Sequence, residues 1–287
     1  MKNLFKLIIS AVAIIFSLST QGQKKSQKLE NSLLWEVSGN GLSKPSYLYG
    51  TIHMICSADY FLSEKTKKAF DSSAKLILEI DLSDPQQLTE MQQMAMGKQP
   101  LSKILSPQDL LKLDNILQQK TGMTIQQVDN FTLFTVMSLV MMKSFGCPDL
   151  KFYEMNFIEM AKQRKLPILG LETMKEQMNM FGKAYSDTEM IKMLEEFKKE
   201  ETDKMVAKYK EEDITALYEF TTDKKVITEE TRKLILDNRN QNWLKTIPEL
   251  IKNESIFIAV GSAHLAGESG IINLLRKAGF TVKPVMN

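Results

Sequence analysis

The segment SIFIAV, residues 255–260, is the part of the chain that most restricts the fold. It is an apolar run of strand length and predicts a buried strand. The sequence GESGIINLLRKAG follows after a short turn and predicts a helix, with Arg276 and Lys277 in its last turn and Gly279 as its C-terminal stop. A final run, TVKPV, predicts a closing strand. Strand, helix and strand in this order indicate an α/β arrangement.

The rest of the chain predicts strands near both ends and helices between them. LLWEV and SYLYG, separated by the turn-rich SGNGLSKP, predict a hairpin, and AKLILEIDL and LPILGLET predict two further strands. From Pro85 to about Ala161 the pattern is helical and rich in methionine, and from Asp187 to Glu212 it predicts a solvated helix face. We therefore expect an α/β fold whose sheet-containing N- and C-terminal halves are joined by a helical insertion over about 85–250.

The methionines have two interpretations. The chain has 18, many of them in stretches such as MQQMAM and FTVMSLVMMKSF. We interpret them as core residues of a helical layer, because a thioether fills irregular gaps. A soft-metal or promiscuous binding surface is the alternative.

The N-terminal segment predicts export. Lys2 and Lys6 precede an apolar run from Leu7 to Leu18, followed by small or polar residues, so residues 1–22 are typical of a signal peptide. The run is shorter than the roughly 20 residues of a transmembrane helix, although an uncleaved membrane anchor is the alternative. We expect a polar leader at 23–32, a single domain at 33–287, and a periplasmic or extracellular protein.

Composition narrows the classes of partner. The formal net charge is +2, which gives no electrostatic case for binding nucleic acid. No second apolar run is long enough to span a bilayer once the signal is removed, and no feature specifies an oligomeric state.

Cys56 and Cys147 are the only cysteines. In an exported protein this pair predicts a disulfide, with two buried thiols as the alternative.

The only two histidines share a local pattern. His53 follows Gly50 by three residues in YLYGTIH, and His264 follows Gly261 by three in AVGSAH. We expect each glycine to take backbone angles closed to other residues, so that the chain turns sharply and presents the histidine. His264 also precedes a predicted helix, whose N-terminal partial charge disfavours protonation of the imidazole.

Four side chains are expected to meet at one edge of the sheet. His53, Glu79, Glu172 and His264 each lie at or just past the end of a predicted strand, and ligands of α/β folds bind outside the carboxyl ends of the strands. Two imidazoles and a carboxylate form a donor set for a catalytic metal. We therefore predict a divalent ion, Zn, Mn, Fe or Co, held by His53, His264 and Glu79. Each side chain has a structural alternative as a buried hydrogen-bonding residue.

Several longer stretches resemble one family. YLYGTIHM, LILEIDL, ILGLETMKEQ, RNQNW and VGSAHLAGESGIINLLRKAGFTVKPV are similar to the TraB/PrgY/GumN family, whose animal relatives are the Tiki proteases. The resemblance implies an α/β fold with two related halves and a metal-dependent hydrolase or peptidase activity. It also implies a site with acidic and arginine partners around the histidines. On this chain the histidines that match are His53 and His264, and the acid after the second strand is Glu79. The other matching residues are Arg239, Asn240, Glu172, Gln177 and, with a carboxylate of altered length, Glu154.

These observations lead to one main functional hypothesis and two alternatives. The main hypothesis is an exported metal-dependent hydrolase of a peptide or amide bond. In it Arg239 stabilises charge on the carbonyl oxygen, and Glu172 or Glu154 acts as general base or orients a histidine. The first alternative is a non-catalytic envelope protein that holds a peptide, tetrapyrrole or metal in the same crevice. The second is a structural protein. Thr51 and Ser262 lack the context of a nucleophile elbow, and we assign them to local backbone hydrogen bonding.

Overall fold

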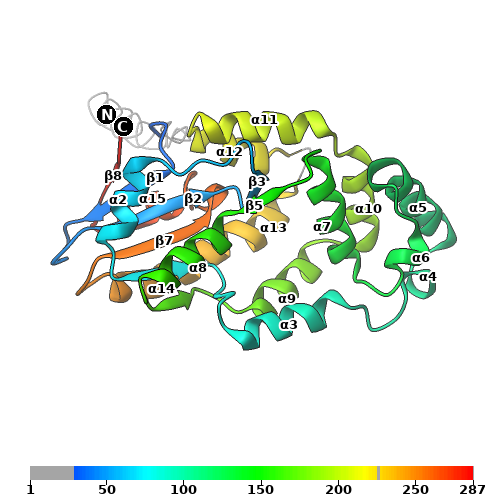
Figure 1. The fold of residues 1–287 in the computed structure, drawn as a ribbon, viewed down its shortest axis with the longest axis horizontal. Helices are drawn as coiled ribbons and strands as arrows, with labels where there is room; N and C mark the ends of the chain where they lie inside the picture. The colour runs from blue at the N-terminus through cyan, green and yellow to red at the C-terminus, as the bar shows by residue number, and fades with distance from the viewer. Residues whose placement is uncertain (1–28, 225–226, 287) are drawn as a thin grey trace, which may run out of the picture.

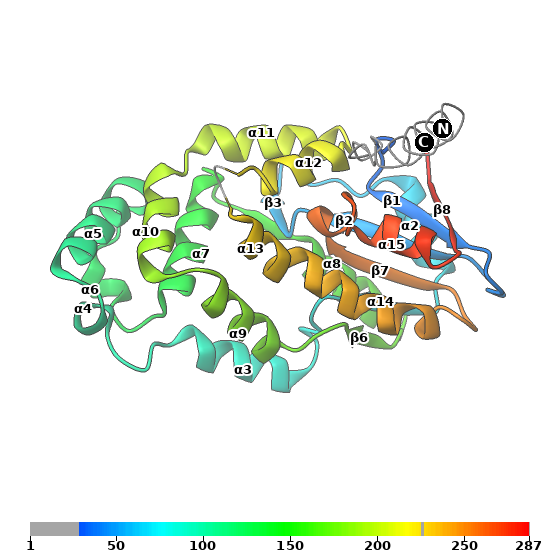
Figure 2. The same cartoon turned by 180° about the vertical axis from the view of Figure 1, so that it is seen from behind.

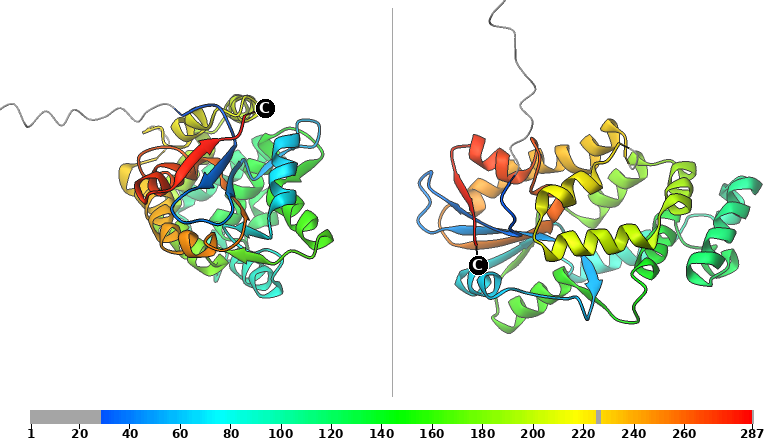
Figure 3. Two further views of the ribbon diagram at one scale, coloured as in Figure 1. Left: turned by 90° about the vertical axis from the view of Figure 1, so that its left-hand side faces the viewer. Right: turned by 90° about the horizontal axis from the view of Figure 1, so that it is seen from above.

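The computed structural model describes residues 29–224 and 227–286. The predicted signal peptide and most of the polar leader lie outside the described residues. The molecule is elongated, with a β-sheet toward one end and a group of helices at the other (Figure 1). Figure 3 shows the same arrangement from the end and from above.

A six-stranded mixed sheet has the order β6-β4-β7-β2-β1-β8. Its strands are β1 (Leu34–Ser38), β2 (Ser46–Thr51), β4 (Lys75–Leu78), β6 (Ile168–Gly170), β7 (Ile256–Gly261) and β8 (Thr281–Pro284). β2, β7, β4 and β6 run parallel, β1 is antiparallel to β2, and β8 is antiparallel to β1. The α/β fold class, the β1–β2 hairpin and the sharing of one sheet by the site-bearing strands are therefore confirmed.

The centre of the sheet is fully buried, as its sequence predicts. All six residues of β7 are buried, because helices cover both faces: α2 (Glu64–Ser72) and α8 (Tyr153–Gln163) lie on the face toward the viewer in Figure 1. The opposite face carries α14 (Asn238–Leu250) and α15 (Ile271–Lys277), which are in front in Figure 2. This layering leaves the carboxyl ends of the parallel strands as the edge that faces the helical part.

The helical part has its own core. Its buried apolar residues include Leu113, Leu117, Val136 and Leu194, which form a cluster separate from the one around the sheet. The remaining helices are α3 (Pro85–Ala95), α4 (Leu101–Ile104), α5 (Pro107–Thr121), α6 (Ile125–Val128), α7 (Leu133–Ser144), α9 (Met174–Ala184), α10 (Asp187–Glu196), α11 (Lys199–Lys210), α12 (Ile214–Thr221), α13 (Glu229–Arg232), the π-helical turn η1 (Lys233–Asp237) and the 3-10 turn η2 (Ser262–His264).

The expectation that the methionine-rich stretches fill this core holds only in small part: Met137 is half-buried and packs against it. None of the six methionines of MQQMAM and FTVMSLVMMKSF is buried, and Met91, Met96 and Met141 are exposed. Leucine, isoleucine and valine supply most of the buried side chains instead.

A short two-stranded sheet was not predicted. β3 (Met54–Cys56) pairs antiparallel with β5 (Leu150–Phe152), which lies inside the stretch predicted to be helical. Three residues are too few to show the alternation of a strand. We call these two strands the β3–β5 ribbon. Cys56 and Cys147 form a disulfide beside it, with their Cα atoms 6.0 Å apart.

Candidate functional site

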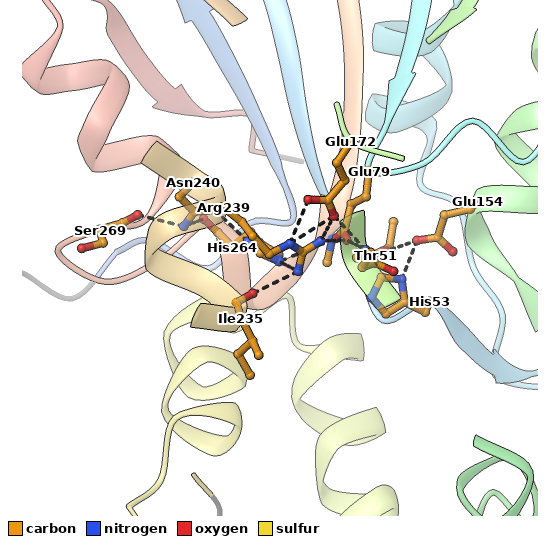
Figure 4. A network of polar contacts seen from close by, with 12 residues as sticks. Thr51, His53, Glu79, Glu154, Glu172, Ile235, Arg239, Asn240, His264 and Ser269 are labelled. Carbon is orange, nitrogen blue, oxygen red and sulfur yellow. Dashed lines mark hydrogen bonds and ion pairs between the residues drawn. The ribbon is translucent and has the colours of Figure 1, made fainter. Parts of the chain in front are cut away.

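The predicted site residues gather at the carboxyl edge of the sheet (Figure 4). Thr51 ends β2 and pairs with Gly261 at the end of β7, while Glu79 directly follows β4. The backbone N–H of Glu172, just after β6, donates to the carbonyl of Glu79 at 2.9 Å. Helix α14 crosses this edge and supplies Arg239 and Asn240, and α9 supplies Gln177. The site residues form one buried network centred on Arg239 and a neighbouring pair, His53 and Glu154.

Arg239 uses all of its donors within the protein. Its Nε donates to Glu172, and its Nη2 donates to both Glu172 and Glu79. Its Nη1 donates to the carbonyl of Ile235 at 3.0 Å and to Nε2 of His264 at 2.9 Å. A guanidinium has five N–H groups, so none remains for a substrate. The prediction that Arg239 stabilises charge on a carbonyl oxygen therefore does not fit this arrangement.

The local helix geometry explains how Arg239 is held. The π-helical turn η1 directly precedes α14, and its Ile235 carbonyl accepts from Arg239. Such turns occur within helices mostly as single bulges, often at functional sites. One turn further along α14, the ring of Trp243 lies 4.9 Å from the guanidinium carbon of Arg239. This stretch lies in the helical insertion predicted over about 85–250, and the sequence gave no sign of the wider turn.

His264 is a buried neutral imidazole. Because a guanidinium only donates, Nε2 of His264 accepts from Arg239, and Nδ1 carries the proton that is donated to Oδ1 of Asn240 at 2.7 Å. Its ring stacks on Trp243 with centroids 4.5 Å apart. Burial and the charge of Arg239 lower the pKa of His264 to about 3. The neutral state of His264 was predicted to come from the N-terminus of the following helix. This reason was wrong, because α15 begins only at Ile271.

Glu79 is a buried carboxylate with three partners. Its Oε1 accepts from the backbone N–H of Gly261 at 2.7 Å, and its Oε2 accepts from Gln177 and Arg239. Burial raises the pKa of Glu79, but the charge of Arg239 outweighs it, and the pKa is held well below its usual range. Gln177 also donates to Glu172 at 2.8 Å, so it links the two carboxylates.

His53 forms a second unit with Glu154 on α8. Its Nδ1 lies 2.8 Å from Oε1 of Glu154, which also accepts from Thr51 Oγ1 at 2.6 Å. Partial burial lowers the pKa of His53, but the charge of Glu154 and its hydrogen bond outweigh this and raise the pKa to about 9. The side chain remains 55% exposed. The assignment of Thr51 to local backbone bonding was wrong, because its partner is 103 residues away.

The motif glycines are required for space and not for their backbone angles. Gly261 has a φ of −53°, and Gly50 is not among the glycines with positive φ. The prediction that both glycines take backbone angles closed to other residues was therefore wrong. A Cβ on Gly261 would lie 3.1 Å from Nε2 of His53 and 3.3 Å from Oε1 of Glu79, and one on Gly50 would lie 3.0 Å from Leu265. His53 itself has a φ of +60°. Gly261 therefore lets His53 and Glu79 approach the end of β7.

The predicted metal does not fit the donors as they are arranged. Oε1 of Glu79 lies 3.8 Å from Nε2 of His264, and His53 is near the same oxygen. However, the lone pair of His264 Nε2 accepts from Arg239, whose guanidinium is already paired with both Glu79 and Glu172. Within residues 29–224 and 227–286 no group of three or more His, Cys, Asp or Glu side chains is arranged to hold a metal ion.

The fold and the site define an α/β protein with a charged network at the carboxyl edge of a largely parallel sheet, where such folds bind ligands. The chain belongs to the TraB/PrgY/gumN family, which it matches over residues 33–284. The resemblance noted in the sequence is thereby confirmed.

Curated relatives are distant or match over a short length. Metalloprotease TIKI2 of Danio rerio is 37% identical over 91 residues, which are 30% of this chain and 17% of that protein. Metalloprotease TIKI1 of Xenopus tropicalis is 22% identical over 346 residues, covering 97% of this chain and 66% of that protein. The chain thus spans a minor part of the zebrafish protein. No solved structure gives a significant match.

Proposed function

We propose that this chain is a hydrolase that cleaves a peptide or amide bond. The observation that carries the proposal is the approach of two side chains at Gly261. Nε2 of His53 and Oε1 of Glu79 both lie within 3.4 Å of the point where a Cβ on Gly261 would stand. An imidazole with a raised pKa and an ionised carboxylate form an acid and base pair. The name metalloprotease carried by the Tiki relatives supports a hydrolase.

In the proposed reaction, Glu79 takes a proton from a water molecule as the water oxygen bonds to the carbonyl carbon. The bond from carbon to nitrogen then breaks, and the protonated Nε2 of His53 gives its proton to the leaving nitrogen. Glu154 holds His53 through Nδ1 and favours its charged form. Arg239 and Gln177 position Glu79 and keep it ionised. No step uses His264 or Glu172, which complete the network around Arg239.

Peptide cleavage by matched variants tests this function. The purified protein is incubated with a mixed peptide library, and products are identified by mass spectrometry. Glu79→Gln and His53→Gln are expected to lower kcat by roughly a hundredfold or more, the usual contribution of a general acid or base. Glu159→Gln, an exposed glutamate on α8, serves as the control with wild-type activity. Wild-type activity in Glu79→Gln would contradict the proposal. Peptides that bind but are recovered intact would indicate the alternative function, a non-catalytic protein that binds peptides.

Metal dependence has its own test, because the relatives are named metalloproteases. Activity is measured before and after chelation and again with Zn, Mn, Fe or Co restored. The bond from Arg239 to His264 Nε2 predicts no change on chelation. Loss of activity that one metal restores would mean that Arg239 leaves His264 in the active form.

We also propose that the protein is exported to the periplasm or the extracellular space. The disulfide between Cys56 and Cys147 supports this, since such bonds persist mainly in oxidising compartments. No helix in the described part of the chain is long and apolar enough to cross a membrane. Cell fractionation, with thiol alkylation before and after reduction, tests the proposal: free thiols in a cytoplasmic fraction would contradict it.

A further inference from the structure

A second candidate binding site lies in the helical part of the molecule. A cavity of about 580 Å³ is bounded by α3, α7, α9, α10 and the segments between α3 and α4 and before α7. This volume is in the range of small-ligand sites. Its wall includes Met94, Phe131, Phe134, Met178, Phe181 and Met190. Methionine and phenylalanine together make an apolar surface that adapts to differently shaped groups.

The charged residues at the cavity do not favour a charged ligand. Lys98 and Asp187 are the ionisable side chains among the described residues that line it, and they have opposite signs. The cavity is therefore suited to an uncharged apolar group. Of the six methionines in MQQMAM and FTVMSLVMMKSF, Met94 contributes to this wall.

Gly182 shows that part of the wall is left open. It lies inside α9, where glycine is the poorest helix former after proline. A Cβ at this position would meet no atom within 4 Å. Packing therefore does not require glycine here, and this exposed position of the cavity wall has room for a larger side chain.

Helix α9 connects this cavity to the charged site. Gln177 donates to Glu79 and Glu172, and Phe181 and Gly182 lie on the next turn of the same helix. Four residues of α-helix advance roughly 6 Å. The cavity thus begins about one helical turn from a residue that holds the proposed base. An extended peptide advances about 3.3 Å per residue, so a bound peptide would cover the distance in a few residues.

We propose that this cavity is the specificity subsite of the hydrolase and accepts one apolar side chain of a peptide substrate. The side chain belongs to a residue roughly two to four positions from the bond that is cleaved. This inference rests on the proposed function for the identity of the ligand. It adds the class of substrate: peptides that carry Leu, Phe or Met at that distance.

The test uses fluorescein-labelled decapeptides of Gly, Ser and Asn in which a single Leu, Phe or Met is moved along the sequence. Cleavage sites are read by mass spectrometry, and kcat/KM is compared with that of the parent peptide. Wild-type protein is expected to cut at a fixed distance from the apolar residue. Burial of one such side chain predicts a preference of roughly tenfold to a hundredfold.

Two variants alter the cavity in opposite directions. Gly182→Leu, which places a bulky side chain at the cavity wall, is expected to abolish this preference, whereas the matched Gly182→Ala retains it. Met178→Ala, which enlarges the cavity, is expected to shift the preference from Leu toward Phe. Thermal unfolding shows which variants are folded. If Gly182→Leu does not fold, the comparison of wild type with Met178→Ala still tests the subsite. A fixed-distance preference that is the same in wild type, Gly182→Leu and Met178→Ala overturns the inference.

Binding separates this inference from the proposed function. If wild-type protein cleaves none of the peptides, the hydrolase proposal fails, and fluorescence anisotropy of the same peptides then tests the cavity. Tighter binding of the Leu, Phe or Met peptides than of the parent, lost in Gly182→Leu, supports an apolar side-chain site. Equal affinity for all of the peptides overturns it.

Discussion

Arg239 brings two carboxylates, an imidazole and a backbone carbonyl into contact through one side chain. The planar guanidinium suits this task because its five donors are fixed in direction. Its positive charge lowers the pKa of both His264 and Glu79, which keeps the imidazole neutral and the carboxylate ionised. His53, held by Glu154, has its pKa moved in the opposite direction. At neutral pH, His53 is therefore positively charged and His264 is neutral.

Histidine NMR tests this contrast at the residue scale. The chain has two histidines, so ¹³C-labelled imidazoles give two sets of signals, which His264→Gln assigns. We expect His53 to lose its proton near pH 9 and His264 to stay neutral down to about pH 3, or until the protein unfolds. Glu154→Gln should return the pKa of His53 toward its ordinary value near 6.5. Two histidines that both titrate near 6.5 would contradict the structure.

The sequence predicted which residues meet but not how they pair. His53, Glu79, Glu172 and His264 were found because strand ends can be recognised from apolar runs, and parallel strands bring their ends together. The contacts of Glu154 with His53 and Thr51 span 101 and 103 residues, and no local pattern encodes them. The saturation of the donors of Arg239 likewise depends on tertiary packing. A metal site and an arginine-centred network can use the same residue types.

Gly261 shows a similar limit on prediction. The sequence suggested unusual backbone angles, whereas the structure requires a missing Cβ. Gly261→Ala is expected to push His53 and Glu79 away from β7, lowering the free energy of unfolding by roughly 1–3 kcal/mol, as overpacking does, and reducing activity. Gly182→Ala is the matched control: it adds a methyl group in open space and should stabilise α9 by up to about 1 kcal/mol. Urea unfolding measures both, and equal effects would contradict this account.

Among the secondary-structure elements, the β3–β5 ribbon has the closest connection to the site. His53 directly precedes β3, and its carbonyl accepts from the backbone N–H of Tyr153, next to Glu154. The disulfide joins Cys56, the last residue of β3, to Cys147 near the start of β5. The ribbon therefore holds His53 and Glu154 together across a long stretch of chain. Long strands such as β7 were predictable from composition, but three-residue strands depend on their partner.

Removal of the disulfide is expected to affect both stability and the site. In the double variant Cys56→Ser and Cys147→Ser, the free energy of unfolding should fall by roughly 2–4 kcal/mol, because the unfolded chain gains freedom. The pKa of His53 should also fall below about 9 as its contact with Glu154 loosens. Urea unfolding and histidine NMR measure the two effects.

The reduced wild-type protein is the control for this variant and should behave in the same way. An unchanged pKa of His53 alongside reduced stability would show that the ribbon holds its geometry without the disulfide.

In the whole molecule, the buried network lies between the sheet and the helical part. Arg239 and Asn240 come from a helix that covers the sheet, while Gln177 comes from α9, which also bounds the apolar cavity. A change of charge at this junction affects the contacts of several elements at once. The stability of the whole fold should therefore depend on pH through a few buried groups.

We predict that acid destabilises the protein well before most carboxylates are protonated. The unfolded chain protonates His264 near pH 6.5, but the folded protein does so only near pH 3, so the unfolded state binds more protons in this interval. The free energy of unfolding should thus fall as pH drops from about 6.5 to 3, by roughly 3–5 kcal/mol. Glu79 adds to the loss below about pH 4.5, because its pKa is also lowered in the folded state.

The variant His264→Gln isolates the contribution of the histidine. It is neutral at every pH, so the loss of stability between pH 6.5 and 4.5 should largely disappear, while the loss below pH 4.5 through Glu79 remains. Raising the pH also destabilises the protein, in this case through His53, whose pKa is raised in the folded state. The stability from its pair with Glu154 is lost between about pH 6.5 and 9. Because His53 is 55% exposed, this second loss should be the smaller one. Urea titrations from pH 4 to 9 measure the decrease in the free energy of unfolding at both acidic and alkaline pH. If the decrease at acidic pH is equally large in wild type and His264→Gln, His264 is not the group responsible.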